Sequence, residues 1–279
     1  RPDARKTLPV LNAAWEECTA CNLGNYRKTV GGAFVAGEGQ PGGIMFIGEG
    51  PGKEEETAGR PFVGQPGRIL RSAIELLGIT RYYITNTVPC RSCMQDYDGE
   101  GQPKYRKDFK TGVQMPVIFD LPPSTAQMSA CRQRLQEEIY IIDPALIVSL
   151  GPSAAAALSG RAVSIQSENG VAFSVSIPGA GRRASLTDKK QAWVRKVRGE
   201  FLVPNEQSTV EYLIVPVLHP QFVSCKRRDE RWQNPVQMFV EGMRKASSTY
   251  NRYMFEVYGF QQVHRDLTTD DLQRAMDNE

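Results

Sequence analysis

The sequence lacks several features that would assign it to a special class of protein. None of its apolar runs approaches the ~20 residues of a membrane-spanning helix. No charged and then apolar targeting segment stands at its N-terminus, and no internal repeat is present. With 279 residues, of which 41% are hydrophobic, the chain is long enough for one large core or two modest ones. We therefore expect a globular protein of the cytoplasm with no membrane partner.

The chain also has little excess charge of either sign. The net charge is only +3, which is too small by itself to indicate a polyanionic partner. Its distribution is uneven, because residues 181–199 and 225–232 are basic whereas residues 266–279 are acidic. Taken alone, each basic run is most simply interpreted as a solvated face.

Cysteine, in contrast, is well represented, although a cytoplasmic chain of this length does not need disulfides to hold its core. Two pairs have the spacing C-x-x-C, in "EECTACNLG" and in "VPCRSC". Clustered thiols of this kind indicate a metal site, and two such pairs taken alone would suggest zinc. The six cysteines are Cys18, Cys21, Cys90, Cys93, Cys131 and Cys225.

Four short apolar runs rich in β-branched or aromatic residues predict strands. None alternates with period two, so each is expected to be buried on both faces, as parallel strands covered by helices are. Apolar residues recur at helical spacing over 67–78 and 124–143, and the second segment begins with Ser124 and Gln127 at capping-box spacing. The four runs are residues 43–48, 82–87, 145–151 and 212–219.

This order of elements predicts the α/β class. We expect a three-layer α/β/α fold with a central four-stranded parallel sheet. Two long segments rich in glycine, proline and charge, residues 93–123 and 161–210, are expected to be insertions. Residues 235–279 are expected to form a helical tail, and the whole chain, 1–279, a single domain.

Polar groups follow the predicted strands. In an open parallel sheet the ligand lies beyond the carboxyl ends of the strands, where this chain has Gly48, Asn86 and His219. Backbone amides, a carboxamide and an imidazole suit a flat polar heterocycle better than a phosphate chain. The phosphate-binding pattern G-x-x-x-x-G-K-[ST] is absent, and the three carboxylates of residues 54–56 would repel a triphosphate.

A family resemblance is carried by the N-terminal C-x-x-C and by four further segments. They are similar to segments of the iron-sulfur (family four) uracil-DNA glycosylases, in order, over residues 12–160 and 196–245. The resemblance implies an enzyme that flips a base out of DNA and hydrolyses its N-glycosidic bond, with uracil as the expected base. We also expect a monomer that is associated with the nucleoid, and the sequence leaves open whether its DNA is single- or double-stranded. The segments are "GEGPGKEEETAGRPFVGQPGRIL", "ITNTVPCR", "LIVSLGPSAAAALSG" and "VLHPQF".

The resemblance implies a 4Fe-4S cluster. Residue by residue, its ligands would be Cys18, Cys21, Cys90 and Cys131. Cys93 is then an extra thiol, and the motifs leave open whether it replaces Cys131. We favour Cys131, because it lies on a capped helix, whereas Cys93 opens an insertion.

The resemblance also assigns roles in a base pocket. Glycines let main-chain amides approach a planar ring closely, and an aromatic side chain on a loop is suited to stacking on a base. Asn86 would read the pairing edge with its carboxamide, and Glu55 would exclude the methyl group of thymine. The residues expected around the base are Gly48, Glu49, Gly50, Glu55, Phe62 and Asn86.

His219 is expected to donate a hydrogen bond to the negative charge that develops on the departing base. It is one of two histidines, and the other, His264, is expected to be structural. Gly50 stands where the best-known uracil glycosylases have a water-activating aspartate. The attacking water would then be positioned by Glu49 or by the main chain.

The segment after His219 resembles a loop that enters the minor groove of DNA. Phe222 and Val223 would form a wedge in the base stack, and Arg227 or Arg228 would bind phosphate. Gln221 replaces the small residue that is usual in the family, which leaves the geometry of the wedge open.

Two other functions remain as alternatives. The two insertions exceed what the family usually carries, and they could adapt the pocket to a modified base, such as the glucosylated hydroxymethylcytosine of phage DNA. A non-catalytic nucleic-acid-binding module held by zinc or iron-sulfur would agree with the missing aspartate. The joint presence of Phe62, Asn86 and His219 argues against such a module, because a binder needs no pocket that reads a base.

Overall fold

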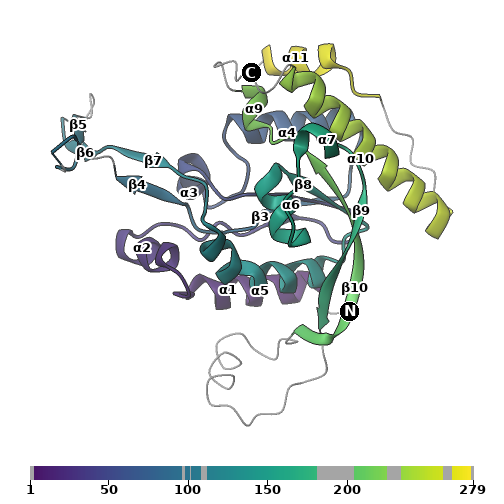
Figure 1. Ribbon diagram of the computed structural model, residues 1–279, viewed down its shortest axis with the longest axis horizontal. Coiled ribbons are helices and arrows are strands. Elements are labelled where there is room, and N and C mark those ends of the chain that lie inside the picture. The colour runs from purple at the N-terminus through teal and green to yellow at the C-terminus, as the bar shows by residue number, and fades with distance from the viewer. Residues whose placement is uncertain are drawn as a thin grey trace, which may run out of the picture.

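The computed structural model describes residues 3–95, 98–100, 102–107, 112–180, 204–224, 234–259 and 266–277. Its centre is a six-stranded sheet in the order β1-β3-β2-β8-β10-β9 (Figure 1). The strands are β1 Glu38–Gly39, β2 Ile44–Gly48, β3 Tyr82–Asn86, β8 Leu146–Leu150, β9 Phe173–Ala180 and β10 Pro204–Val217.

The helices begin and end where local sequence signals indicate. Helix α5 starts at the predicted cap, where Ser124 N donates to Gln127 Oε1 at 2.7 Å and Gln127 N donates to Ser124 Oγ at 3.3 Å. It ends at Asp143, whose backbone is left-handed. The helices are α1 Ala4–Glu16, α2 Asn22–Val30, α3 Lys53–Ala58, α4 Gln65–Leu76, α5 Thr125–Ile142, α6 Pro152–Ser159, α7 Ile165–Glu168, α9 Gln221–Ser224, α10 Pro235–Tyr258 and α11 Thr269–Asp277.

The four predicted runs form the middle of the sheet. β2 pairs with β3 and with β8, and β10 pairs with β8, all in parallel. Every residue of β2 and of β8 is buried, as the absence of alternation predicts. The register places Gly48 beside Asn86, so the carboxyl ends of β2 and β3 lie together.

The sheet is wider than the four strands predicted. β1 is antiparallel to β3 at one edge, and β9 is antiparallel to β10 at the other. β9 lies within residues 161–210, and its Val175 and Ile177 are buried while Ser174 and Ser176 are exposed. This alternation is typical of an antiparallel strand with one covered face. Part of the second predicted insertion therefore belongs to the central sheet.

Helices cover both faces of the sheet and make the three layers predicted (Figure 1). On one face, Leu70 of α4 lies in the same core as Phe46 of β2. On the other face, Ile139 of α5 packs in a second core with Ile147 of β8. Helices α10 and α11 follow within the predicted tail, and Leu272 of α11 lies in the first core. No helix in the described ranges is long and apolar enough to cross a membrane.

The first predicted insertion forms an arm that projects from the body of the protein (Figure 1). Strand β4 (Cys93–Gln95) pairs with β7 (Ile118–Asp120), and β5 (Tyr105–Lys107) pairs with β6 (Gln114–Pro116), both antiparallel. Because β4 follows β3 along the chain, the arm begins close to the carboxyl ends of the central strands.

Candidate functional site

Three of the predicted base-binding residues meet at the ends of β2 and β3. A Cβ atom at Gly48 would lie 2.5 Å from Asn86 Oδ1 and 2.5 Å from Phe62 Cζ. Any side chain at position 48 would therefore displace both neighbours. Because Gly48 has no side chain, the carboxamide of Asn86 and the ring of Phe62 can both lie close to its main chain.

The carboxamide of Asn86 is buried, with 2% of the residue exposed. Its Oδ1 has no hydrogen-bond partner within the part of the chain that the structure describes. A buried acceptor without a donor costs ~1–3 kcal/mol of stability, and such a group in a native protein calls for an explanation, such as a catalytic role or a bound ion. Asn86 therefore offers an acceptor to a ligand that carries an N–H group.

A buried ion pair holds the main chain at Asn86. Arg134 Nη2 of α5 donates to the carbonyl oxygen of Asn86 at 2.5 Å, and Arg134 Nη1 donates to Glu138 Oε2 at 2.9 Å. Glu138 also accepts from the Tyr83 hydroxyl at 2.9 Å and from Thr85 Oγ1 at 3.1 Å. Sequence reasoning missed this network. The spacing of Arg134 and Glu138 is visible in the sequence, but such pairs are usually solvated.

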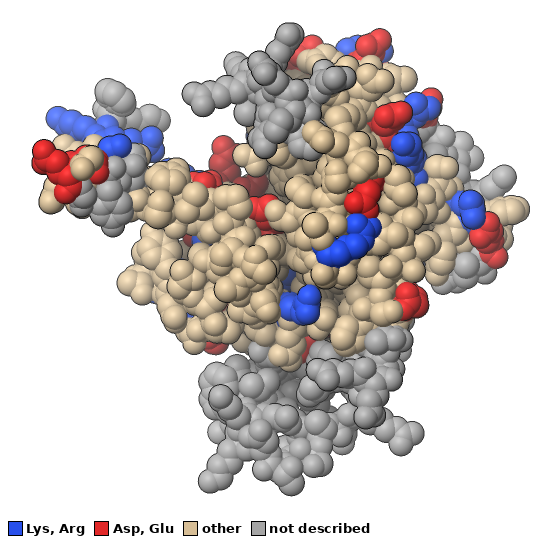
Figure 2. Space-filling view, in the orientation of Figure 1, with Lys and Arg blue, Asp and Glu red and all other residues tan. Residues whose placement is uncertain are grey.

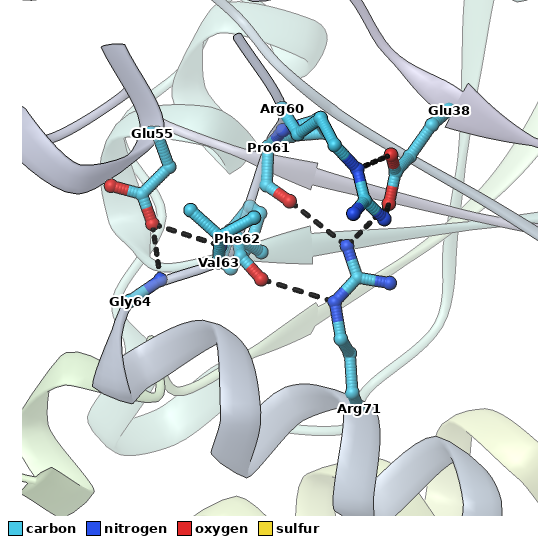
Figure 3. Close-up of polar contacts among 8 residues, drawn as sticks. All are labelled: Glu38, Glu55, Arg60, Pro61, Phe62, Val63, Gly64 and Arg71. Carbon is cyan, nitrogen blue, oxygen red and sulfur yellow. Dashed lines mark hydrogen bonds and ion pairs between the residues drawn. The ribbon is translucent and has the colours of Figure 1, made fainter. Parts of the chain in front are cut away.

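Hydrogen bonds and ion pairs hold the loop that carries Phe62 (Figure 3). Phe62 has a left-handed backbone with φ 53°, which is unfavourable for a bulky residue. Arg71 of α4 donates to the carbonyl oxygens of Phe62 at 3.1 Å and of Pro61 at 2.9 Å. Glu38 of β1 in turn accepts from Arg71 at 2.6 Å and from Arg60 at 2.8 Å. These contacts hold the ring in its place beside Gly48.

Glu55 joins the two ends of the same loop. Its Oε1 accepts from the main-chain N–H groups of Val63 at 3.1 Å and Gly64 at 2.9 Å (Figure 3). Its Oε2 accepts from the N–H of Gly52 at 3.1 Å. The carboxylate is thus bonded to the pocket loop itself. Its expected part in excluding thymine stays a prediction.

His219 lies two residues beyond the end of β10, and its ring centroid is 5.9 Å from that of Phe62. The main-chain N–H of Gln221 donates to His219 Nδ1 at 3.2 Å, which leaves the ring proton on Nε2. Burial lowers the pKa of His219 to about 4, because surrounding atoms exclude the water that would solvate a charged ring. At pH 7 the imidazole is therefore a neutral donor.

The segment Glu49–Gly50 crosses between the two strand ends. The N–H of Val88 donates to the Glu49 carbonyl at 3.2 Å, and Thr87 Oγ1 donates to the same oxygen. A Cβ atom at Gly50 would meet only Pro123 Cγ and the Val88 carbonyl, each at 3.9 Å. The roles expected of Glu49 and Gly50 stay predictions.

The predicted DNA-binding residues are described only in part. Val223 on α9 is 9% exposed and lies in the first core, and Phe222 packs against that core. The wedge expected of these two residues stays a prediction. Arg227, Arg228, Cys225, His264 and the basic run at 181–199 lie outside the described residues.

Four of the five described cysteines are neighbours. The pKa of Cys131 is raised to about 12, chiefly by burial and also by the adjacent thiols of Cys21, Cys90 and Cys18. Cys93 stands apart, next to Arg91, Glu56 and Tyr26. None of the five is in a disulfide. Among the described residues, no group of three or more His, Cys, Asp or Glu side chains is placed to hold a metal ion.

Arg27 is a cation beside these thiols. Burial raises the pKa of the Cys90 thiol, and a hydrogen bond from Arg27 opposes that rise. The four neighbouring thiols come from the turn between α1 and α2, from the segment after β3 and from α5. A group bound there would tie these three parts of the chain together.

Comparison with known proteins agrees with this geometry. The family model described as the uracil DNA glycosylase superfamily matches residues 37–241. A type-4 uracil-DNA glycosylase of Thermotoga maritima is 34% identical over 248 residues, which are 86% of this chain and 93% of that protein. The same enzyme type from Pyrobaculum aerophilum is 32% identical over 203 residues, covering 70% of this chain and 89% of that protein. The resemblance noted in the sequence is confirmed, and the chain belongs to the type-4 branch of the uracil-DNA glycosylase superfamily.

Proposed function

We propose that this protein removes uracil from DNA by hydrolysing the bond between the base and its deoxyribose, which leaves an abasic site. The observation that carries the proposal is the buried, unpartnered Oδ1 of Asn86, which lies beside Phe62 at the strand ends. The names of the relatives agree with this activity.

Base selection would follow from the carboxamide of Asn86. Uracil has an imino N–H that suits the unpartnered Oδ1, and its neighbouring carbonyl suits the amide N–H₂ of the same side chain. Cytosine has no imino N–H and carries an amino group in place of that carbonyl. A flipped cytosine would leave both partners unpaired, and sites built on hydrogen bonds reject such analogues strongly. Phe62 would supply the stacking surface.

Bond cleavage would rely on His219. As the C1′–N1 bond breaks, its electron pair passes to the base and negative charge builds on the base oxygen. The neutral His219 donates its Nε2–H to that oxygen, and this contact strengthens as the charge develops. A water oxygen then bonds to C1′ and releases a proton. Glu49 is the carboxylate we propose to orient this water, because Gly50 presents main chain alone.

The four neighbouring cysteines, Cys18, Cys21, Cys90 and Cys131, would hold a 4Fe-4S cluster. A cluster takes one thiolate on each iron, so its four sulfurs stand further apart than the ligands of one zinc ion. The four thiols neighbour one another, as the ligands of one cluster must. When bound, the cluster would supply structural support for the turn before α2.

DNA is the partner that this activity requires. Phe222 and Val223 would enter the base stack, and Arg227 and Arg228 would bind phosphate. The monomeric state, the preference for single- or double-stranded DNA, and a cytoplasmic, nucleoid-associated location stay predictions.

Purified protein incubated with labelled oligonucleotides tests the activity. Each oligonucleotide carries one target, namely uracil, hypoxanthine, a thymine mismatch or a glucosylated hydroxymethylcytosine, and abasic sites are then cleaved with alkali. We expect strand scission at uracil and none at thymine. Scission at the modified cytosine alone would mean that this base, and not uracil, is the substrate. The absence of scission at every base would mean that the protein is a binding module.

A further inference from the structure

The arm is anchored at the rim of the candidate site. We use this name for the described residues 93–95, 98–100, 102–107 and 112–123. Arg91 joins Asp120 at 2.5 Å and Glu56 of α3 at 3.3 Å, and the N–H of Leu121 donates to the Ser92 carbonyl at 2.9 Å. Pro123 at the base of the arm faces Gly50. The arm therefore starts where a flipped base would enter.

The outer part of the arm is built for contact with another molecule. β5 and β6 form a two-stranded ladder that pairs with no other described strand, and such ladders are marginally stable in water by themselves. Tyr105 is 56% exposed and Met115 is 47% exposed. A ladder that leaves large apolar side chains in solvent gains stability when a partner covers them.

The charge of this outer part fits a polyanion. Arg106 and Lys107 follow Tyr105 on β5, and all three are exposed. Figure 2 shows the basic side chains of the arm gathered along its upper edge, on the side where α9 lies in Figure 1. The described part of the arm has three acidic side chains, Asp98, Glu100 and Asp120. Glu100 is exposed, and the other two are engaged within the arm or at its base. Asp120 pairs with Arg91, and Asp98 accepts from the main-chain N–H groups of Glu100 and Gln102.

We propose that β5 and β6 bind the DNA strand beside the flipped nucleotide. Arg106 and Lys107 pair with phosphates, and Tyr105 packs on an adjacent sugar or base. Basic residues interleaved with an exposed aromatic are the usual means of holding a DNA strand. The inference rests on the proposed function, and it adds a second DNA contact away from the pocket.

The length of the arm sets which nucleotides it reaches. Pro116, the partner of Tyr105 in the ladder, lies seven positions before Pro123, and extended chain spans at most about 3.3 Å per residue. Pro116 thus lies at most ~23 Å from Pro123, a distance that corresponds to about seven base pairs of DNA at 3.4 Å each. Because β7 is extended and the arm projects from the body of the protein (Figure 1), we expect the ladder to lie beyond the ~10 Å that three base pairs span. DNA that ends three base pairs from the target base on that side would then be too short to meet it.

Binding to two lengths of DNA tests the proposal. The probes are duplexes with a stable abasic analogue, with flanks of either twelve or three base pairs on both sides. For the long probe, the double variant R106A/K107A is expected to bind about tenfold more weakly at 0.1 M salt, with the slope of log K against log salt reduced by about 1.8. For the short probe, wild type and double variant should bind alike.

Two further variants complete the test. Tyr105→Ala should weaken binding to the long probe alone, with an unchanged melting temperature. Arg252→Ala, at an exposed position of α10 where Arg252 pairs with Glu256, is the matched control and should leave both probes unaffected. An unchanged salt slope in R106A/K107A, or equal losses on both probes, would overturn the proposal. Self-association that depends on Tyr105, with unchanged DNA affinity, would instead assign the arm to a protein partner.

The two proposals fail separately. Uracil excision from the short duplex needs the pocket but not the arm, so R106A/K107A should excise there at the wild-type rate. If the wild type excises no uracil but its DNA binding still depends on probe length, the proposed activity is wrong and the proposed DNA contact of the arm is supported.

Discussion

Arg134 donates a 2.5 Å hydrogen bond to the main-chain carbonyl of Asn86, a residue that lies 48 positions away in the chain. Both residues are buried, and Glu138 balances the charge of the guanidinium at 2.9 Å. The donor that holds the main chain of Asn86 therefore comes from a helix layer, whereas Asn86 itself ends a strand of the central sheet. Because Arg134 holds the main-chain carbonyl of Asn86, the side-chain carboxamide is left to contact a ligand.

Arg134→Met should lower both stability and activity. It leaves Glu138 buried without its cation, which costs about 3–5 kcal/mol of unfolding free energy. The double variant Arg134→Met/Glu138→Gln should regain part of that stability but not the excision rate, because the carbonyl of Asn86 still lacks its donor. Urea unfolding and single-turnover excision measure the two effects. Arg132→Met, on the exposed side of the same helix, is the control, and full recovery of the rate in the double variant would contradict the positioning role.

Asn86→Ala should reduce excision of uracil severely and leave binding to abasic DNA nearly unchanged. The loss of a bidentate contact costs ~1–3 kcal/mol, and more when buried groups are left unpaired. Asn86→Asp should shift preference toward a cytosine-like edge. Single-turnover rates and abasic-site affinities, measured on one preparation, check this. Equal losses of rate and affinity would make Asn86 a structural residue.

His219→Ala should lower the single-turnover rate by roughly a hundredfold or more with little change in DNA affinity, because the contact strengthens only as charge develops. In the wild type, the neutral ring persists down to the folded pKa of about 4. The rate should therefore show no acid limb near pH 6.5. An acid limb near pH 6.5 that is lost in His219→Ala would mean that the pKa of the ring is not lowered, and a rate that falls above pH 6.5 would mean that the charged ring is the active form.

The same histidine should make stability depend on pH. Its folded pKa of about 4 lies below the ordinary value of 6.5, so between these values the unfolded chain binds the extra proton. Its contribution is complete above pH 6.5 and is lost as the pH falls toward 4, by about 1–3 kcal/mol. Urea unfolding of wild type and His219→Gln at pH 7 and pH 5 checks this, and parallel losses in both proteins would be evidence against it.

Arg71→Met should loosen the Phe62 loop. Without the two hydrogen bonds to the carbonyls of Pro61 and Phe62, the left-handed conformation at Phe62 is less well held. We expect KM for uracil DNA to rise and kcat to fall, with a smaller loss of stability, about 1–2 kcal/mol. Arg68→Met on the same helix is the comparison. Wild-type kinetics in Arg71→Met would show that the loop needs no such support.

The variants Cys131→Ser and Cys93→Ser should differ in their iron content. Protein prepared without oxygen should be brown, absorb near ~400 nm and contain about four irons per chain. We expect Cys131→Ser to lose iron and Cys93→Ser to keep it, because only Cys131 neighbours the other three thiols. The opposite result would make Cys93 the fourth ligand, and zinc in place of iron would refute the cluster.

Local patterns predict much of this protein. The four non-alternating apolar runs became the four parallel strands, and the capping pair Ser124 and Gln127 begins α5 as expected. Both are properties of neighbouring residues, so they can be recognised before the chain folds. Val175 and Ile177, with a serine between them, alternate as an antiparallel strand does, but the glycine, proline and charge of residues 161–210 are typical of an insertion and hide this signal.

The sequence by itself determined the four central strands, the helices α4 and α5, and the set of chemical groups at the strand ends. Only the tertiary structure decided how those groups are held. The contacts of Arg134 with Asn86 and of Arg71 with Phe62 join different elements, and the burial that gives them their strength exists only after the layers have packed. Spacing along the chain cannot distinguish a solvated arginine from a buried one, because burial depends on which surfaces meet.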